Sequence, residues 1–478
     1  MIPSAVKQTL RALRHKNYRL FFTGQSLSLI GTWMQQVALG WLVYRLTDSA
    51  FLLGLVGFSS QIPTFVLASF AGVLADRYSK HKILIATQTL AMLQAFILAF
   101  LTLTSTIQIW QILLLSLFSG LINAFDMPTR QSFVIDMVDD RNDLPNAIAL
   151  NSSVFNAARL IGPTLAGVLI TAVGEGLCFL INAISYITVI AALLLMNISP
   201  QINNNKKEKM LEGFKEGIKY AYNFKPIRVL LLLIGLVSLT GMPYSVLMPI
   251  FARDILHGDA HTLGFLFGAV GSGALIGAIY LASRKSVLGL GKWIAIATTI
   301  FSLGLFFFSF SRNIYLSVGL MLFTGFGMMM QMASTNTLLQ TLVDDDKRGR
   351  IMSLYVMAFM GTAPFGSFMA GTLASTIGAP YTVLSSGIIC LAGALIFYKN
   401  LPSLRKHIRP IYIQKGILPE VSKGLQSSTH FEDAAELIYF DKIYSEKTLF
   451  TNSNSSSVNG LSIADKFTLT CLKFLKTE

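Results

Sequence analysis

The segment Gly72-Val-Leu-Ala-Asp76-Arg77-Tyr-Ser-Lys80-His-Lys82 joins two long apolar stretches, which we assign to residues 50–75 and 83–104. Each stretch is longer than the ~20 residues that a helix needs to cross the hydrocarbon core of a bilayer. The basic residues of the segment mark a short loop on the side of the membrane where Lys and Arg accumulate. This pattern of apolar helix, short basic loop and apolar helix recurs along the chain.

Hydrophobic residues make up 53% and charged residues 13% of the 478 positions. A soluble domain carries about 25% charged residues, so the composition indicates a membrane protein. Only helices and closed barrels satisfy their backbone hydrogen bonds in lipid, and the apolar runs have the length of helices. We therefore predict an all-α membrane protein with twelve transmembrane helices in two six-helix bundles. The predicted spans are 19–44, 50–75, 83–104, 107–126, 146–172, 174–197, 228–251, 261–282, 292–310, 313–335, 351–376 and 378–398.

The net charge of +14 is unevenly distributed. Most Lys and Arg residues lie in the N-terminal segment and in every second connection, while the remaining connections hold Arg45, Arg253 and Arg312. By the positive-inside rule, both termini are expected in the cytoplasm, with a bacterial plasma (inner) membrane as the site. The basic excess is thus a topology signal, and we expect no nucleic acid as partner.

The chain divides into four predicted parts. Residues 1–197 form the first bundle, and residues 198–227 form a cytoplasmic linker with an amphipathic helix over 207–222. Residues 228–400 form the second bundle, and 401–478 a cytoplasmic tail that we expect to be disordered after about 428, with a marginal helix near 463–476.

The two bundles have the character of repeats. Gly72–Lys80 matches Gly277–Lys285 at a separation of 205 positions, and Val138–Asp140 matches Val343–Asp345 at the same separation. Pro163 matches Pro364 at 201. Two repeats with a site at their interface are typical of secondary transporters.

The loop at 72–82 resembles the Gly-x-x-x-Asp-Arg-x-x-Arg/Lys-x-Arg/Lys signature of the major facilitator superfamily. The stretch from Leu13 to about Leu425 resembles the branch that contains the bacterial enterobactin-type exporters, also described as transmembrane secretion effectors. Supporting segments are Trp41–Ser49, Arg159–Gly167 and Arg348–Tyr355. The resemblance implies a transporter that works by rocker-switch alternating access.

The resemblance also implies a gating role for the loop, through Gly72, Asp76, Arg77 and Lys80. Its implied partners are Asp126 at the end of span four and Arg350 at the start of span eleven. Lys80 keeps the positive charge but lacks the guanidinium fork. An ordinary positive-inside loop is the alternative interpretation.

Span five contains Ser152, Asn156, Arg159 and Pro163 at spacings that place them on one helical face. Arg159 is expected ~20 Å along the helix from its inner start, at 1.5 Å per residue. An arginine at that depth should face a polar cavity or an acidic partner, so we predict that it binds an anionic group of the substrate or joins a coupling network. Structural pairing with backbone carbonyls or a polar neighbour is the alternative.

Polar side chains in other apolar spans predict further cavity-lining positions, with interhelical hydrogen bonding as the alternative. With Asn156 and Arg159, the predicted cavity residues are Gln25, Ser28, Thr32, Gln35, Gln36, Asn123 and Gln331. Small residues and prolines predict hinges or close helix packing rather than ligand contact. These positions are Gly162, Pro163, Gly167, Pro364 and Gly371.

We expect export of a small amphiphilic molecule such as a siderophore or drug-like compound, driven by the proton gradient, by a monomer in the lipid bilayer. Asp126 is the one carboxylate that we place within a span, so coupling is expected to run through Asp76 and Asp126 unless the carrier is uniporter-like. The alternatives are a lysophospholipid or lipid flipping carrier, an uptake symporter and, least favoured, a sensor or enzyme. No nucleotide-binding loop, metal cluster or catalytic constellation is recognisable, so no cofactor, metal or enzymatic activity is expected.

Overall fold

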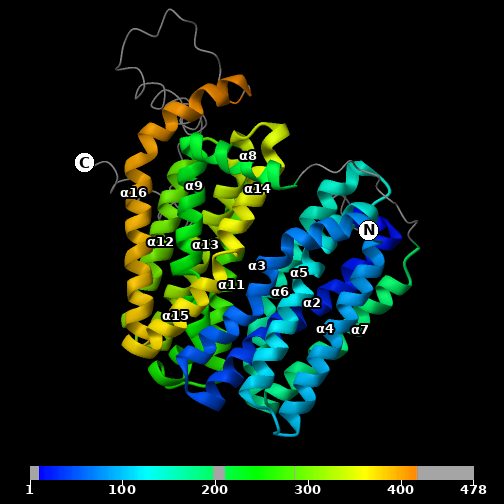
Figure 1. Cartoon of the computed structure of the whole chain (residues 1–478). Coiled ribbons are helices and arrows are strands. Elements are labelled where there is room, and N and C mark those ends of the chain that lie inside the picture. Colours follow the sequence, from blue (N-terminus) through cyan, green and yellow to red (C-terminus); the bar gives the residue numbers. More distant parts are fainter. Residues whose placement is uncertain (1–9, 198–209, 285, 416, 418–478) are drawn as a thin grey trace, which may run out of the picture. The chain divides into compact units, whose positions relative to one another are not determined.

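The computed structural model describes residues 10–197, 210–284, 286–415 and 417, without the side chains of 68–77, 210–214 and 345–346. The described part is helical throughout (Figure 1). The helices of the N-terminal half are η1 (Arg11–Arg14), α2 (Lys16–Thr47), α3 (Ala50–Arg77), α4 (Lys80–Leu103), α5 (Ile109–Asp136), η2 (Arg141–Asp143), α6 (Leu144–Val173) and α7 (Glu175–Leu194). Those that follow are α8 (Met210–Asn223), α9 (Lys225–Leu236), η3 (Val237–Gly241), α10 (Tyr244–Ile250), η4 (Phe251–Ile255), α11 (Ala260–Ser283), α12 (Leu290–Phe310), α13 (Ile314–Leu342), α14 (Asp345–Met360), α15 (Ala363–Ile377) and α16 (Ala379–Gln414).

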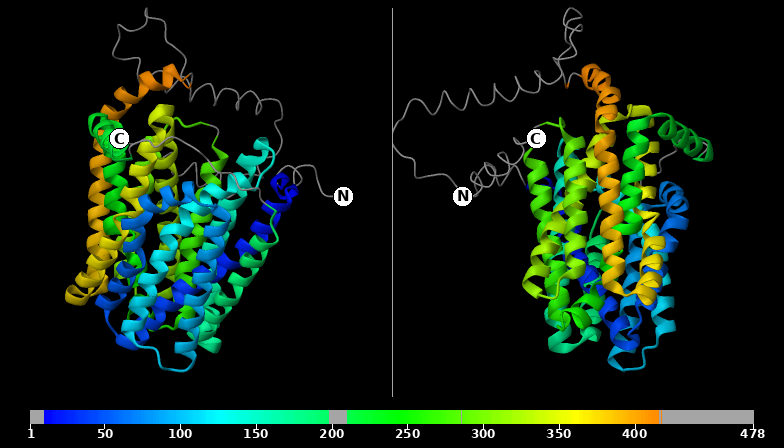
Figure 2. Two further views of the ribbon diagram at one scale, coloured as in Figure 1. Left: turned by 45° about the vertical axis from the view of Figure 1, so that its right-hand side comes forward. Right: turned by 90° about the vertical axis from the view of Figure 1, so that its left-hand side faces the viewer.

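Helices α2–α7 form one bundle and α9–α16 a second, as predicted (Figures 1 and 2). Eleven stretches of the described helices are long and apolar enough to cross a membrane. The twelfth span is α2, whose 32 residues are also long enough, but its three glutamines lower its mean hydropathy. We call the end of the bundles that carries η1, η2 and α8 the basic end, and the opposite end, with the turns at Asp48, Gly174 and Gly378, the far end.

Two predicted spans are interrupted at prolines. Span seven consists of α9, η3, α10 and η4, in which η3 and η4 are π-helical turns next to Pro243 and Pro249. Span eleven is divided into α14 and α15 at residues 361–362, because Pro364 has no N–H to continue the helical ladder. α6, by contrast, continues through Pro163.

The amphipathic helix predicted over 207–222 is present as α8, within the part of the linker that is described. The last span ends later than predicted, because α16 continues past residue 398 to Gln414. The predicted disorder after 428 and the marginal helix near 463–476 lie outside the described residues.

The two halves contact each other through glycines. Gly167 of α6 lies against Gly264 of α11, where a Cβ on Gly167 would be 3.0 Å from the Cα of Gly264. Gly54 of α3 lies against Gly371 of α15, where a Cβ on Gly54 would be 2.7 Å from the Cα of Gly371. Both pairs permit backbone-to-backbone packing that side chains would prevent.

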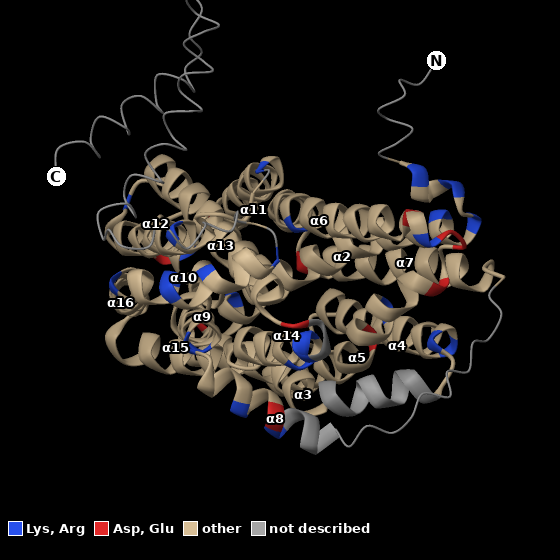
Figure 3. Ribbon diagram, turned by 90° about the horizontal axis from the view of Figure 1, so that it is seen from above, with Lys and Arg blue, Asp and Glu red and all other residues tan. Residues whose placement is uncertain are grey.

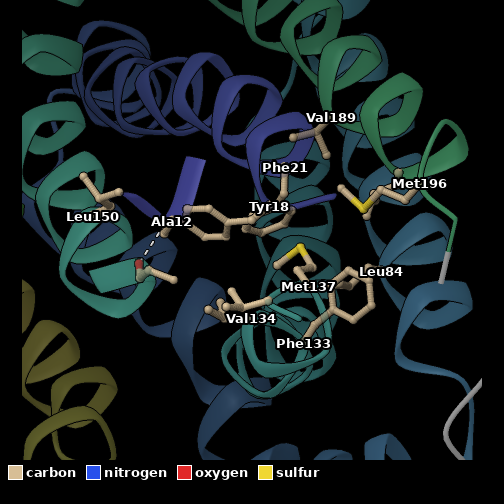
Figure 4. Packing of buried hydrophobic residues seen from close by; sticks show 13 residues of the cluster. Ala12, Tyr18, Phe21, Leu84, Phe133, Val134, Met137, Leu150, Val189 and Met196 are labelled. Atoms are coloured by element: carbon tan, nitrogen blue, oxygen red, sulfur yellow. Dashed lines mark hydrogen bonds between the residues drawn. The ribbon is translucent and has the colours of Figure 1, made fainter. Parts of the chain in front are cut away.

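At the basic end, the N-terminal half is held by a cluster of buried apolar side chains from α2, α4, α5, α6 and α7 (Figure 4). Tyr18 is fully buried there, and its hydroxyl group donates to the carbonyl oxygen of Ala147 at 2.7 Å. Charged residues surround the cluster: His15 contacts Asp143 at 2.9 Å, and Arg14 contacts Asp143 at 2.8 Å. These contacts fix the start of α2 against the α5–α6 connection.

We predict that Gly167→Val opens the far end. Its side chain would collide with backbone atoms of α11, and forced overpacking of this kind costs about 1–3 kcal/mol. Spin labels at Thr106 and Thr376, in a variant without native cysteines, should report a longer distance distribution. The matched control is Gly319→Val in α13, because nothing lies within 4 Å of a Cβ at that position. An unchanged distribution in Gly167→Val would show that the crossing does not hold the halves together.

Candidate functional site

Arg159 lies between the two halves. Its Nη2 donates to the Sδ of Met328 in α13 at 3.3 Å, and its guanidinium carbon lies 5.7 Å from the ring centre of Trp33 in α2. Trp33 in turn packs edge-on against Phe155, at 5.7 Å between ring centroids. Among the contacts of Arg159 with described residues there is no ion pair with a carboxylate. A guanidinium with one sulfur acceptor and an aromatic face keeps donors for an anionic ligand.

The contact between α6 and α11 reaches Arg159. The two helices are in contact from Gly167 to Leu160, where a Cβ on Gly271 would be 2.8 Å from the Cα of Leu160 and 3.3 Å from the carbonyl oxygen of Arg159. The backbone of Arg159 thus lies at this crossing, while its side chain lies against Trp33 and Met328.

The predicted polar stripes divide into exposed and buried residues. Thr32, Gln36 and Asn123 are exposed, and Asn156 is partly exposed with its amide donating to the carbonyl of Ser152 at 2.8 Å. Gln25 and Ser28 are buried, at 3% and 1% exposure.

Gln35 has the geometry of an interhelical connector. Its Nε2 donates to Gln94 Oε1 at 3.1 Å, and its Oε1 accepts from Asn182 Nδ2 at 2.7 Å. These bonds join α2, α4 and α7 inside the N-terminal half. The sequence did not single out Gln94 and Asn182, although both are amides within apolar spans.

Gln331 in α13 is 1% exposed, and neither its Nε2 nor its Oε1 has a hydrogen-bond partner. Ser334, one turn further on, is also buried with an unpartnered hydroxyl. Buried polar atoms without partners are destabilising and are rare in folded proteins. These two side chains form a polar spot within an apolar helix.

Asp126 is buried among polar side chains of the N-terminal half. Its carboxylate pairs with Arg130 one turn along α5, and accepts from Thr87 Oγ1 at 2.9 Å and Gln88 Nε2 at 2.7 Å. Asp126 is only 2% exposed, so its charge is stabilised by these side chains and not by water. Protonation of Asp126 would remove the charge that holds Arg130.

The predicted gating residues lie on separate elements in this conformation. Lys80 Nζ contacts Asp136 Oδ2 at 2.9 Å, and Arg350 Nη1 donates to Glu216 Oε2 of α8 at 2.6 Å. The backbone of Gly72, Asp76 and Arg77 belongs to α3, but their side chains lie outside the described part. The gating role remains a prediction.

The predicted hinge residues lie at helix crossings. A Cβ on Gly162 would be 2.6 Å from the Cβ of Trp33, so Gly162 lets α6 approach α2. Gly167 and Gly371 belong to the two crossings between the halves, and Pro163 and Pro364 are buried beside them.

A polar contact at the far end joins the halves and was missed by the sequence analysis. Arg253 of η4 pairs with Asp48 at the end of α2 and lies 5.5 Å from the ring centre of Tyr44, while Tyr44 donates to Asp254. Asp48 and Arg253 are 205 positions apart, which is the separation of the repeat. Equivalent ends of spans one and seven thus meet, and the repeat offset could have identified the pair.

Figure 3 shows the Lys and Arg residues in blue and the Asp and Glu residues in red, in a view onto the basic end. In the described part of the chain, no group of three or more His, Cys, Asp or Glu residues could hold a metal ion. The Asp48–Arg253 ion pair between the halves lies at the far end, whereas Lys80–Asp136 lies within the N-terminal half and Arg350–Glu216 joins α14 to the linker helix.

Comparison with known proteins identifies the family of this chain. The model of the transmembrane secretion effector family matches residues 7–411. The staphyloferrin A transporter of Staphylococcus aureus is 26% identical over 384 residues, covering 80% of this chain and 95% of that protein. The multidrug efflux pump Tap of Mycolicibacterium fortuitum is 25% identical, covering 77% of this chain and 92% of the pump.

Solved structures have the same fold. A bacterial homologue of the iron transporter ferroportin, in an inward-facing state, aligns with a TM-score of 0.63 at 18% identity, covering 80% of this chain and 98% of that one. A bacterial homologue of the lysosomal transporter Spinster, inward-facing and unoccupied, aligns with a TM-score of 0.64 at 12% identity over 82% and 98%.

We predict opposite effects for two glutamine replacements. Gln331→Leu should raise the melting temperature, because it removes two unpartnered buried polar atoms whose desolvation costs about 1–3 kcal/mol. Gln35→Leu should lower it, because Gln94 and Asn182 lose their partner. Thermal unfolding of both purified variants in one detergent measures the difference. A lower melting temperature in Gln331→Leu would show that its amide is satisfied in the working protein.

Proposed function

Because the chain belongs to the transmembrane secretion effector family of major facilitator transporters, we propose that it exports a small amphiphilic molecule bearing an anionic group. The molecule would cross by rocker-switch alternating access, driven by the proton gradient. Relatives named as a siderophore transporter and as a multidrug efflux pump support this substrate range.

The observation that carries this proposal is Arg159. A charged side chain inside a membrane is expensive and is commonly found on a substrate or ion pathway. It has no carboxylate partner among the described residues, and it contacts residues of both halves, Trp33 and Met328. An anionic group of the substrate would supply the missing counter-charge. The indole ring and the flexible thioether would accommodate its apolar part.

Thr32, Gln36, Asn123 and Asn156 extend the proposed site. All four are polar, at least partly exposed and placed within membrane-crossing helices. Such positions are favourable on a water-filled cavity and unfavourable against lipid. We assign them to the substrate cavity, with a polar layer behind it formed by the buried Gln25, Ser28 and Gln331 and the half-buried Gln35.

The contacts between the halves support alternating access. The glycine crossings and the Asp48–Arg253 pair join the halves toward the far end. We infer that this conformation is closed at the far end and that the substrate enters from the basic end. Return to the other conformation would require the glycine crossings to separate, with the loop of Asp76, Arg77 and Lys80 and its partners Asp126 and Arg350 biasing the equilibrium.

For proton coupling, we assign Asp126 with Asp76. Asp126 is buried at 2% exposure and paired with Arg130. A proton on Asp126 would release Arg130, and a displaced Arg130 would change the charge at the inner end of α5. Thr87 and Gln88 would hold the carboxylate in either state.

We place the basic end in the cytoplasm of a bacterial cell, with both termini on that side, and propose that the protein acts as a monomer in the plasma membrane. The excess of Lys and Arg in alternate connections supports the orientation. Lipid flipping and uptake are the competing transport modes.

We predict that Arg159→Ala weakens binding of an anionic substrate by roughly 10- to 100-fold, because a hydrogen bond to a charged group contributes about 1.5–3 kcal/mol. Arg159→Lys should be intermediate, since it retains the charge without the guanidinium fork. Ligand binding to the purified protein should be compared for an anionic compound and its neutral ester. Equal loss for both compounds would show that Arg159 supports the fold instead of binding the anion.

We predict that Asp126→Asn abolishes proton-driven accumulation in vesicles but retains exchange of substrate for substrate. Thr87→Val is the matched control, because it removes a hydrogen bond to Asp126 and leaves the ion pair intact. Transport should be measured with an imposed pH gradient and without one. Proton-driven accumulation by Asp126→Asn at the wild-type rate would exclude Asp126 as a coupling residue.

A further inference from the structure

A cavity of about 310 Å³ lies at the basic end between α8 and α14, apart from the proposed transport site. In α8, Glu216, Lys219, Tyr220 and Asn223 follow the spacing of one helical face and line it. From α14, the lining residues are Lys347, Arg350 and Ile351. Figure 3 shows α8 and α14 as neighbours at this end.

The lining of the cavity is predominantly cationic. Lys219, Lys347 and Arg350 line it with one carboxylate, that of Glu216, and Lys347 also pairs with Asp344 outside the lining, at 3.6 Å. Arg350 uses Nη1 to donate to Glu216 at 2.6 Å, and a guanidinium has five N–H donors in all. The ammonium group of Lys347 lies 4.9 Å from the ring centre of Tyr220. Such a set of donors matches a phosphate group.

The two helices are held close enough for one small anion to contact both. Gly217 faces Arg350, and a Cβ on Gly217 would be 3.2 Å from the Cβ of Arg350. A side chain at position 217 would displace Arg350 by a few tenths of an ångström. The cavity is therefore framed by this close approach as well as by the Arg350–Glu216 bridge.

The apolar surface beside the cavity indicates that the phosphate belongs to a lipid headgroup. On the adjoining face of α8, Ile218 is 45% exposed and Tyr222 is 67% exposed, one turn apart. Arg228 lies 5.1 Å from the ring centre of Tyr222. An amphipathic helix with an exposed apolar face and a basic face is typical of the interface between headgroups and acyl chains.

We propose that the α8–α14 cavity binds the headgroup of an anionic phospholipid. The phosphate contacts Lys219, Lys347 and Arg350, and the acyl chains leave along Ile218 and Tyr222. Glu216 competes with the phosphate for Arg350. Because α14 is the part of span eleven before its break at residues 361–362, a bound lipid joins that half-span to the linker helix.

The test is a lipid titration of the purified full-length protein, followed by native mass spectrometry. The probe is dioleoylphosphatidylglycerol, with dioleoylphosphatidylcholine as the zwitterionic comparison. Each basic residue near an anionic headgroup contributes roughly fivefold in affinity, so Lys219→Gln with Lys347→Gln should raise the Kd roughly 30-fold. Lys215→Gln is the matched control, since Lys215 is exposed on α8 and does not line the cavity.

A second variant is expected to bind the lipid more tightly, so the test does not rest only on variants that lose affinity. Glu216→Gln should lower the Kd for phosphatidylglycerol, because it frees Arg350 from its carboxylate partner. Equal affinity of the wild type, the double variant and Glu216→Gln would overturn the proposal, as would equal binding of phosphatidylcholine. Competition by soluble sn-glycerol 3-phosphate at the concentration of the lipid would assign the cavity to a soluble phosphate ester instead.

Discussion

Direct backbone packing at two glycine pairs, Gly167 with Gly264 and Gly54 with Gly371, is the constraint on which the arrangement of the halves depends. The two pairs are related by the internal repeat, since spans two and five of the first half correspond to spans eight and eleven of the second. Small residues at such crossings let the two backbones approach closely. In lipid no hydrophobic effect drives helices together, so the van der Waals contacts of this close packing hold them in place. The crossings bring spans two and five of the first half against spans eleven and eight of the second.

The position of Arg159 follows from the same crossing. Leu160 and the carbonyl oxygen of Arg159 lie against Gly271 of α11, and the side chain of Arg159 lies between the halves, against Trp33 and Met328. The Asp48–Arg253 and Tyr44–Asp254 contacts lie at the far end, beyond the crossings. Among the described residues, such a transporter has in its middle a cation with no acidic partner, a polar contact between the halves at one end and separate charge clusters at the other.

The sequence predicted the spans well because apolar length and basic loops are local properties. Predicted and observed helix ends agree closely for α4, α6 and α11, and the amphipathic linker helix was located within a few residues. Contacts across the halves were not predicted, because they depend on how two bundles pack. Gln35 illustrates the limit: its spacing placed it with the cavity residues, whereas the nitrogen and the oxygen of its amide both bond within one half. Pro364 indicated a hinge in span eleven, where the helix is interrupted, but the matching Pro163 leaves α6 continuous.

Gradient-driven export is the central claim, and the most direct test is accumulation of a chemically diverse panel by efflux-deficient bacteria that express the protein. The panel comprises a catecholate siderophore, a lipophilic cationic dye and a lysophospholipid, each with and without a protonophore. The account predicts lower accumulation of an anionic amphiphile, restored to the level of control cells by the protonophore. Unchanged accumulation of every compound, in cells where the protein is folded in the membrane, would contradict it.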